Sequence, residues 1–193
     1  MRICQAYQEN FSRNFVFILC VALLLHSCYN MENRYFLACK ICCAAESRYF
    51  PQIGGRRTEA DECFGVRARE FSQADTIVIA APYWDLSFPS LLKIYFEAVT
   101  VCGMTFRYEN ESPKGLCRAE RLFYITTVGG PIISDFGFSY VRELAENFYG
   151  IRQTKCFRAE GLDIIGADEE GILKRARDEI KEWFSENPDT AEL

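Results

Sequence analysis

The hydrophobic and polar positions follow a regular pattern from Thr58 onward. Short β-branched apolar runs alternate with stretches in which apolar residues return every three or four positions. Runs of the first kind are typical of buried strands, and the longer spacing is typical of helices that pack along one side. Buried strands are therefore predicted at residues 76–81, 121–127 and 154–158.

Turn and capping residues set the predicted limits of the helices. Thr58 with Asp61 resembles a capping pair, and Pro89 suits the first turn of a helix. The predicted helices start near Thr58, Pro89, Phe138 and Ile172. The first three end near Asp75, Gly103 and Gly150, and the last one stops before Pro188. Residues 109–115 are predicted to be a polar turn region. Strands alternating with helices imply a parallel sheet with right-handed crossovers, so the predicted class is a three-layer α/β fold.

The chain before Thr58 has no such regularity. An apolar run starts at Phe15 and ends at Leu25, which is shorter than the roughly 20 residues that a membrane span needs. It suits the first buried strand of the sheet, the core of a signal peptide behind Arg2 and Arg13, or an atypical amino terminus. No membrane span is expected. A cytoplasmic location is expected, with export as the alternative if the run is a signal core.

Composition narrows the classes of function. The chain has 193 residues and a formal net charge of −5, which fits one domain and gives no footprint for nucleic acid or an anionic membrane. His26 is the single histidine, so sites built from several histidines are excluded and few histidine-based catalytic relays remain.

The cysteines gather in the first third of the chain. Cys39 and Cys42 have the CxxC spacing, but no second ligand pair accompanies them, and Cys63 and His26 are the nearest further candidates. Reduced thiols are therefore expected here, with no metal site and no disulfide framework.

Candidate chemistry lies after two predicted strands. Ligands of an open parallel sheet bind outside the carboxyl ends of its strands. Aromatic side chains follow the first of these strands, where they offer flat apolar surface, and a glycine pair with neighbouring hydroxyls follows the second. The candidate residues are Pro82, Tyr83, Trp84, Asp85 and Leu86 in the first loop and Thr126, Thr127, Val128, Gly129 and Gly130 in the second. The alternative is that the aromatic pair is rim packing and the glycines are only a turn.

The absence of several known motifs narrows the range of expected ligands. The sequence has no GxGxxG, GxxxxGK[ST] or GxSxG motif, which disfavours a dinucleotide-binding Rossmann domain, a P-loop NTPase and an α/β-hydrolase. A planar ring system edged with carbonyls and ring nitrogens suits both loops, so a flavin is the predicted ligand.

Ordered motifs in the same region resemble a known family. They lie at residues 80–89, 92–96, 103–108, 114–116, 126–130 and 158–161. Together they resemble the flavodoxin-like FMN-dependent NADH:quinone oxidoreductases and azoreductases over residues 68–184. The whole chain is thus expected to be one flavodoxin-like domain, with an atypical region at 1–57, the recognisable portion at 58–185 and a tail at 186–193.

The resemblance implies a fold, a cofactor and a reaction. The fold would be a flavodoxin-like sheet of order 2-1-3-4-5 with atypical first strands, in a homodimer whose sites lie near the subunit interface. FMN would bind noncovalently, with the loop from Pro82 to Leu86 against its ring and the loop from Thr127 to Gly130 at its polar edge. NADH or NADPH would reduce the flavin, and a quinone or azo compound would then take the hydride in ping-pong order. No catalytic side chain is assigned.

The chain departs from the family at two places. The serine- or threonine-rich loop that holds the FMN phosphate is not recognised, because residues 22–30 offer only Ser27 as a hydroxyl. Pro131, Ile132 and Ile133 stand where some relatives carry polar side chains. The alternative function is therefore a flavodoxin-like protein that lacks a working phosphate site and serves as a binding or interaction module.

Overall fold

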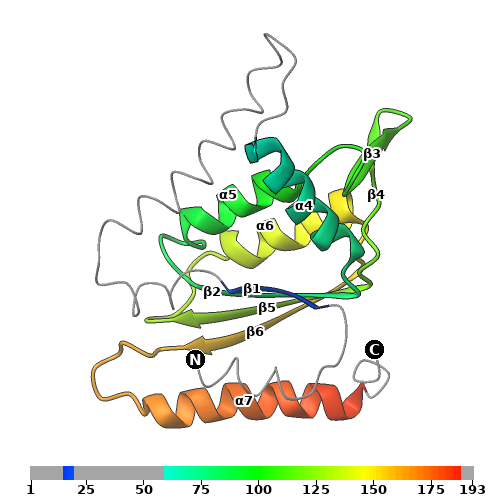
Figure 1. The fold of residues 1–193 in the computed structure, drawn as a ribbon. Coiled ribbons are helices and arrows are strands. Elements are labelled where there is room, and N and C mark those ends of the chain that lie inside the picture. The colour runs from blue at the N-terminus through cyan, green and yellow to red at the C-terminus, as the bar shows by residue number, and fades with distance from the viewer. Residues whose placement is uncertain (1–14, 20–58, 188–193) are drawn as a thin grey trace.

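The computed structural model describes residues 15–19 and 59–187, with side chains from Gly65 onward. Its main sheet has four parallel strands in the order β1-β2-β5-β6 (Figure 1). These are β1 (Phe15–Leu19), β2 (Thr76–Pro82), β5 (Arg121–Val128) and β6 (Gln153–Glu160). The strands fall where apolar runs were predicted, and Pro82 is the last residue of its strand.

Helices cover both faces of the sheet. One face carries α4 (Glu59–Gln73), α5 (Ser90–Val99) and α6 (Phe136–Leu144), and the other carries α7 (Glu169–Glu186) (Figure 1). The predicted three-layer α/β class is confirmed, and the described strands keep the order 1-3-4-5 of the expected sheet. A second strand beyond β1 stays a prediction, because residues 20–58 lie outside the described part.

Each face of the sheet has its own core. In β5, Leu122 and Tyr124 pack with residues of α4, α5 and α6, whereas Phe123 and Ile125 pack toward α7. The α7 side is closed by Trp183, whose ring lies edge-on to Phe123 with 5.1 Å between the ring centroids. Because both faces are buried, the strands are continuously apolar, which is why they were visible in the sequence.

Two local features differ from the sequence prediction. Residues 109–115 are not one turn region, because β3 (Phe106–Glu109) and β4 (Ser112–Gly115) form an antiparallel hairpin around a two-residue turn. The helix predicted to end at Gly150 does so, but its last turn is a π-helix, η1 (Ala145–Tyr149). Pro113 and Gly115 are both disfavoured in strands, which hid the hairpin.

Several sequence predictions lie outside the described residues. They concern the cap at Thr58, the side chains of His26, Cys39, Cys42 and Cys63, and the phosphate loop. The strand interpretation of the early apolar run agrees with β1, which pairs in parallel with β2. Within residues 15–19 and 59–187, no helix is long and apolar enough to cross a membrane.

Candidate functional site

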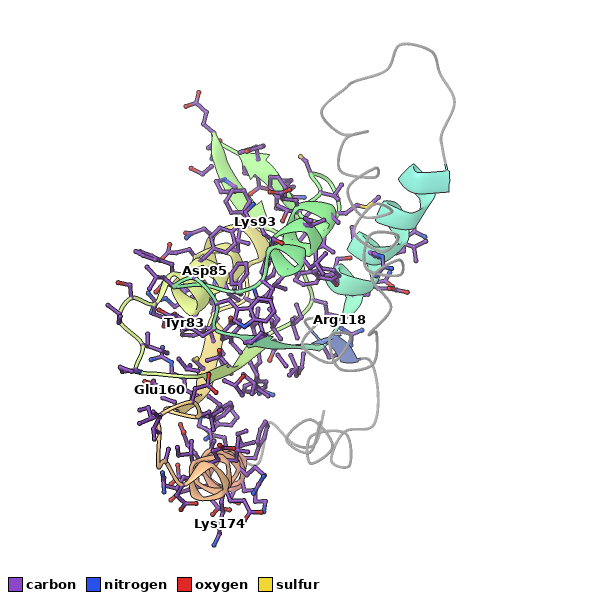
Figure 2. All side chains as sticks on the ribbon, turned by 90° about the vertical axis from the view of Figure 1, so that its left-hand side faces the viewer. Tyr83, Asp85, Lys93, Arg118, Glu160 and Lys174 are labelled. Carbon is purple, nitrogen blue, oxygen red and sulfur yellow. The ribbon has the colours of Figure 1, made fainter. Side chains whose placement is uncertain are left out.

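The two loops singled out in the sequence meet at one edge of the sheet. β2 and β5 are neighbours, with Pro82 opposite Thr127 in the register. Beyond the strands, the amide of Tyr83 donates to the carbonyl oxygen of Thr127 at 2.9 Å. Figure 2 looks from the side to which the strand arrows of Figure 1 point, and Asp85, Tyr83 and Glu160 lie one below another there.

The first loop is a tight turn with an unfavourable backbone. Trp84 and Ser87 exchange two backbone hydrogen bonds, at 3.0 and 2.8 Å, around Asp85 and Leu86. Asp85 and Leu86 have φ of +49° and +67°, which side chains other than glycine rarely adopt and which costs about 1 kcal/mol or more per residue. Trp84 and Leu86 are also 44% and 40% exposed. The turn therefore keeps two apolar side chains partly exposed at a conformational cost, and strained backbone of this kind is often found at binding sites.

The glycine pair of the second loop contacts a third loop. The carbonyl oxygens of Gly129 and Gly130 accept hydrogen bonds from the amides of Asp163, at 2.9 Å, and Gly161, at 3.3 Å. A Cβ on Gly129 would overlap the Asp163 carboxyl group, whereas a Cβ on Gly130 would meet no atom within 4 Å. Gly129 thus permits close packing of the two loops, and Gly130 leaves open space beside the site.

Side chains tie these loops to the start of α6. The Tyr83 hydroxyl donates to the carbonyl oxygen of Ser134 at 2.8 Å, and the Phe136 amide donates to that of Leu86 at 3.2 Å. Asp135 caps α6 by accepting from the Phe138 amide at 2.9 Å, and it forms an ion pair with Arg158 of β6. Hydrogen bonds and an ion pair thus join the loop after β2, the start of α6 and β6 into one framework at this edge of the sheet.

Sequence reasoning assigned no role to the loop after β6. Glu160 accepts the Ile132 amide at 3.2 Å, and Asp163 lies against Gly129. The sequence signal was that this loop, too, follows a predicted strand. Only the sheet order shows that its strand is the neighbour of β5.

The two threonines of β5 lie on opposite faces. Thr126 is only 4% exposed and shares the face of Tyr124, and its Oγ1 has no hydrogen-bond partner among the described residues. Thr127 is half-buried on the α7 side. A buried hydroxyl without a partner is unfavourable, so Thr126 leaves polar capacity unused directly below the site.

The edge combines open donors with exposed apolar surface. The amides of Asp85, Leu86 and Gly130 donate to no acceptor within the described part of the chain. Large apolar side chains around them are also exposed, namely Ile133, Phe136, Ile164 and Ile165 at 82, 61, 54 and 102%. Amide donors beside flat apolar surface suit a planar heteroaromatic ligand. All the sequence-predicted site residues come from these two strand ends.

The thiol of Cys156 is hydrogen-bonded to this framework. Burial raises the pKa of Cys156 to about 11, although the hydrogen bond from the Arg158 guanidinium, 3.3 Å from the sulfur, opposes the rise. Cys156 is therefore protonated near neutral pH.

Comparisons with known proteins identify the fold family. The family described as flavodoxin-like fold matches residues 41–184. An FMN-dependent NADH:quinone oxidoreductase 2 of Clostridium acetobutylicum is 38% identical over 125 residues, which are 62% of this chain and 62% of that relative. An FMN-dependent NADH:quinone oxidoreductase of Lachnoclostridium phytofermentans is 37% identical over 124 residues, with 63% of this chain and 62% of the relative covered. The match thus spans less than two thirds of either relative.

Solved structures support the same fold. The crystal structure of an FMN-dependent NADH-azoreductase from Bacillus anthracis in complex with FMN has a TM-score of 0.65 and 21% identity, and the match covers 95% of this chain and 86% of that one. Sheet order, helical layers and the family match all agree, so this chain belongs to the flavodoxin-like fold family.

Proposed function

We propose that this protein is an FMN-dependent NAD(P)H oxidoreductase that reduces quinones or azo compounds. The observation that carries the proposal is the junction of two strand-end loops, joined by the Tyr83–Thr127 hydrogen bond and open to solvent on one side. The relatives with 37 and 38% identity are named FMN-dependent NADH:quinone oxidoreductases, which supports the same cofactor and reaction.

The residues present fit a flavin. Pro82, Tyr83, Trp84, Asp85 and Leu86 would lie against the ring. The backbone of Thr127, Val128, Gly129 and Gly130 would meet its polar edge, next to the buried Thr126. The open amides of Asp85, Leu86 and Gly130 suit ring carbonyls and nitrogens, and the unpartnered Thr126 hydroxyl is a spare polar group nearby. When bound, FMN would supply the redox chemistry, taking a hydride from NADH or NADPH and passing it to the acceptor in ping-pong order.

The chain's own contribution is binding and orientation. Trp84 and Leu86 offer apolar surface that would exclude water from one side of a planar ligand. The Tyr83 hydroxyl is already used on the carbonyl oxygen of Ser134, so Tyr83 holds the loops together instead of moving a proton. No side-chain acid or base is therefore assigned.

The exposed apolar side chains bear on the acceptor and on assembly. Ile133, Phe136, Ile164 and Ile165 surround the edge, and exposed apolar groups gathered at one place favour apolar ligands or protein contact. We propose a small apolar electron acceptor of the quinone or azo class and a homodimer that covers part of this surface. A cytoplasmic location is part of the same proposal.

A visible absorption spectrum tests the assignment. The full chain is incubated with FMN, gel-filtered and checked by intact mass. We expect one retained flavin per chain, followed by NADH-dependent reduction of a quinone. The Trp84→Ala variant should weaken FMN binding by about tenfold, because it removes a flat wall, whereas Val66→Ala, which trims an exposed side chain of α4, should leave binding unchanged.

The contrary outcome is equally clear. A colourless protein of full mass would contradict the proposal. It would favour the flavodoxin-like binding module that lacks a phosphate site.

A further inference from the structure

A cavity lies at the opposite end of the sheet from these loops. It has a volume of about 510 Å³ and is lined by the first residues of β5 and β6, by α6, and by the end of α7. The candidate site lies at the carboxyl ends of β2 and β5, whereas this cavity lies at the amino ends of β5 and β6. Its volume is in the range of small-molecule sites, which is about 300–1,000 Å³.

The lining concentrates positive charge. Arg121, Arg142, Arg152 and Lys155 line the cavity, and Glu146 is the only carboxylate among its described lining residues. The chain as a whole carries a net charge of −5, so the positive charge of this cavity is opposite in sign to the net charge of the protein.

Protein carboxylates do not neutralise the arginines. Arg142 and Arg152 form no ion pair within the described part of the chain, and Arg121 donates from Nε to the neutral Gln153 at 3.0 Å. The Arg121 Nη1 is buried without a partner there. Lys155 differs, because its Nζ lies 3.5 Å from Glu179. A guanidinium group does not lose its proton in proteins, and Arg142 and Arg152 are exposed, so both stay charged and can reach an anion in solution.

The same cavity has aromatic walls. Phe138 of α6 and Trp183 of α7 both line it. Arginines provide planar donors for phosphate oxygens, and aromatic side chains accept the face or edge of a planar base. Phe138 and Trp183 approach it from opposite faces of the sheet, so we propose that this cavity binds an organic phosphate of mononucleotide size, with its phosphate near the arginines and its aromatic part against Trp183. This site is independent of the proposed flavin site.

Trp183 provides a local signal of occupancy. The chain has two tryptophans, so Trp84→Phe leaves Trp183 as the single one. Titration of this full-length variant with AMP should change Trp183 fluorescence in a saturable way, and added KCl should weaken binding because salt screens the charges. Inorganic phosphate should bind about tenfold more weakly than AMP, because it lacks the aromatic part. Binding that is equally tight for both would overturn the nucleotide assignment.

Charge variants locate the site. In the same background, R142Q/R152Q should weaken AMP binding by about tenfold or more. K174Q/R175Q removes the same charge from exposed positions on α7 outside the cavity and should change binding by less than about twofold; Figure 2 shows Lys174 on the outer side of α7.

A further variant keeps the test valid even if R142Q/R152Q does not fold. Glu146→Gln removes the one carboxylate of the lining and should tighten AMP binding by about threefold. The absence of a saturable response to AMP, or equal losses in the cavity and control variants, would overturn the proposal. Because the readout is Trp183 fluorescence without flavin or turnover, failure here leaves the oxidoreductase proposal untouched.

Discussion

Two buried threonines show how differently the two ends of the sheet are built. Thr105, in the connection that leads toward the amino end of β5, is fully buried, and its hydroxyl accepts from the Val101 amide at 2.9 Å and donates to the Val99 carbonyl at 2.8 Å. Thr126, near the carboxyl end of β5, is as deeply placed but has an unpartnered hydroxyl among the described residues. The Thr105 hydroxyl is satisfied inside the protein, and the Thr126 hydroxyl is not.

The same contrast extends to their surroundings. At the amino end, Thr100 donates to the Phe96 carbonyl at 2.6 Å, so the Tyr149 hydroxyl, 2.7 Å away, is the donor to Thr100. Burial raises the pKa of Tyr149 and keeps that proton in place. At the carboxyl end, Trp84 and Leu86 are exposed on a turn with positive φ. Around Thr105 and Thr100 the hydroxyl groups are paired inside the protein, whereas the unpartnered Thr126 hydroxyl lies in the strand next to β2, which leads into a strained and exposed turn.

The largest expected effect is at the amino end. A Cβ on Gly115 would overlap the backbone of Tyr149 and Gly150, which cannot move as a side chain can. Gly115→Ala should therefore lower the free energy of unfolding by about 3 kcal/mol. Urea denaturation followed by circular dichroism measures this change.

Gly103→Ala is the matched control for that substitution. Gly103 has φ of +83°, and an alanine methyl group there would meet no atom within 4 Å, so only backbone conformation opposes the change. We expect a loss of about 1 kcal/mol. Equal losses in both variants would show that the close approach of Gly115 to Tyr149 and Gly150 does not matter.

Thr105 should give the next largest effect. Thr105→Val keeps the shape of the side chain but removes the two hydrogen bonds of the hydroxyl, so the Val101 amide and the Val99 carbonyl keep only their bond to each other at 2.9 Å. The free energy of unfolding should fall by about 2 kcal/mol, because two buried hydrogen bonds of about 1 kcal/mol each are lost. A loss in urea denaturation of less than half that size would mean that water reaches this position.

The fold was predictable where burial is complete. The run TIVIAA marked β2 to within one residue, because a strand buried on both faces must be apolar throughout. The β3–β4 hairpin was missed because its strands are half-exposed and its turn, Asn110–Glu111, lacks the glycine typical of such turns. Periodicity also could not distinguish the π-helical turn at Ala145 from the α-helix before it.

The sequence predicted which residues of each loop belong to the site, but not the contacts between the loops. Tyr83 and Gly130 were identified because each follows a predicted strand, and that rule needs no knowledge of the sheet order. The contacts of Glu160 with Ile132 and of Asp163 with Gly129 cross between loops, so they depend on β6 lying beside β5. The basic cavity was not predicted for the same reason, since its arginines come from separate segments that only the fold brings together.

A smaller effect should separate two similar turns. Leu86 and Glu111 are each the second residue of a two-residue turn, with φ of +67° and +64°. Leu86→Gly and Glu111→Gly should both raise the free energy of unfolding, by about 0.5–1 kcal/mol, since glycine adopts positive φ without strain. Only Leu86→Gly should also weaken FMN binding in the gel-filtration assay. If both variants bind FMN like the parent, the Leu86 side chain has no role at the site.

The smallest change in stability is expected at Thr126, and it sharpens the opening contrast. Thr126→Val removes a buried hydroxyl that has no partner among the described residues, so no hydrogen bond is lost. The flavin-free protein should therefore unfold with an unchanged free energy or one raised by about 0.5 kcal/mol, opposite in sign to Thr105→Val. FMN binding should weaken if this hydroxyl is held in reserve for a ligand. A loss of stability without flavin would instead mean that Thr126 is satisfied inside the protein, and the two threonines would then be alike.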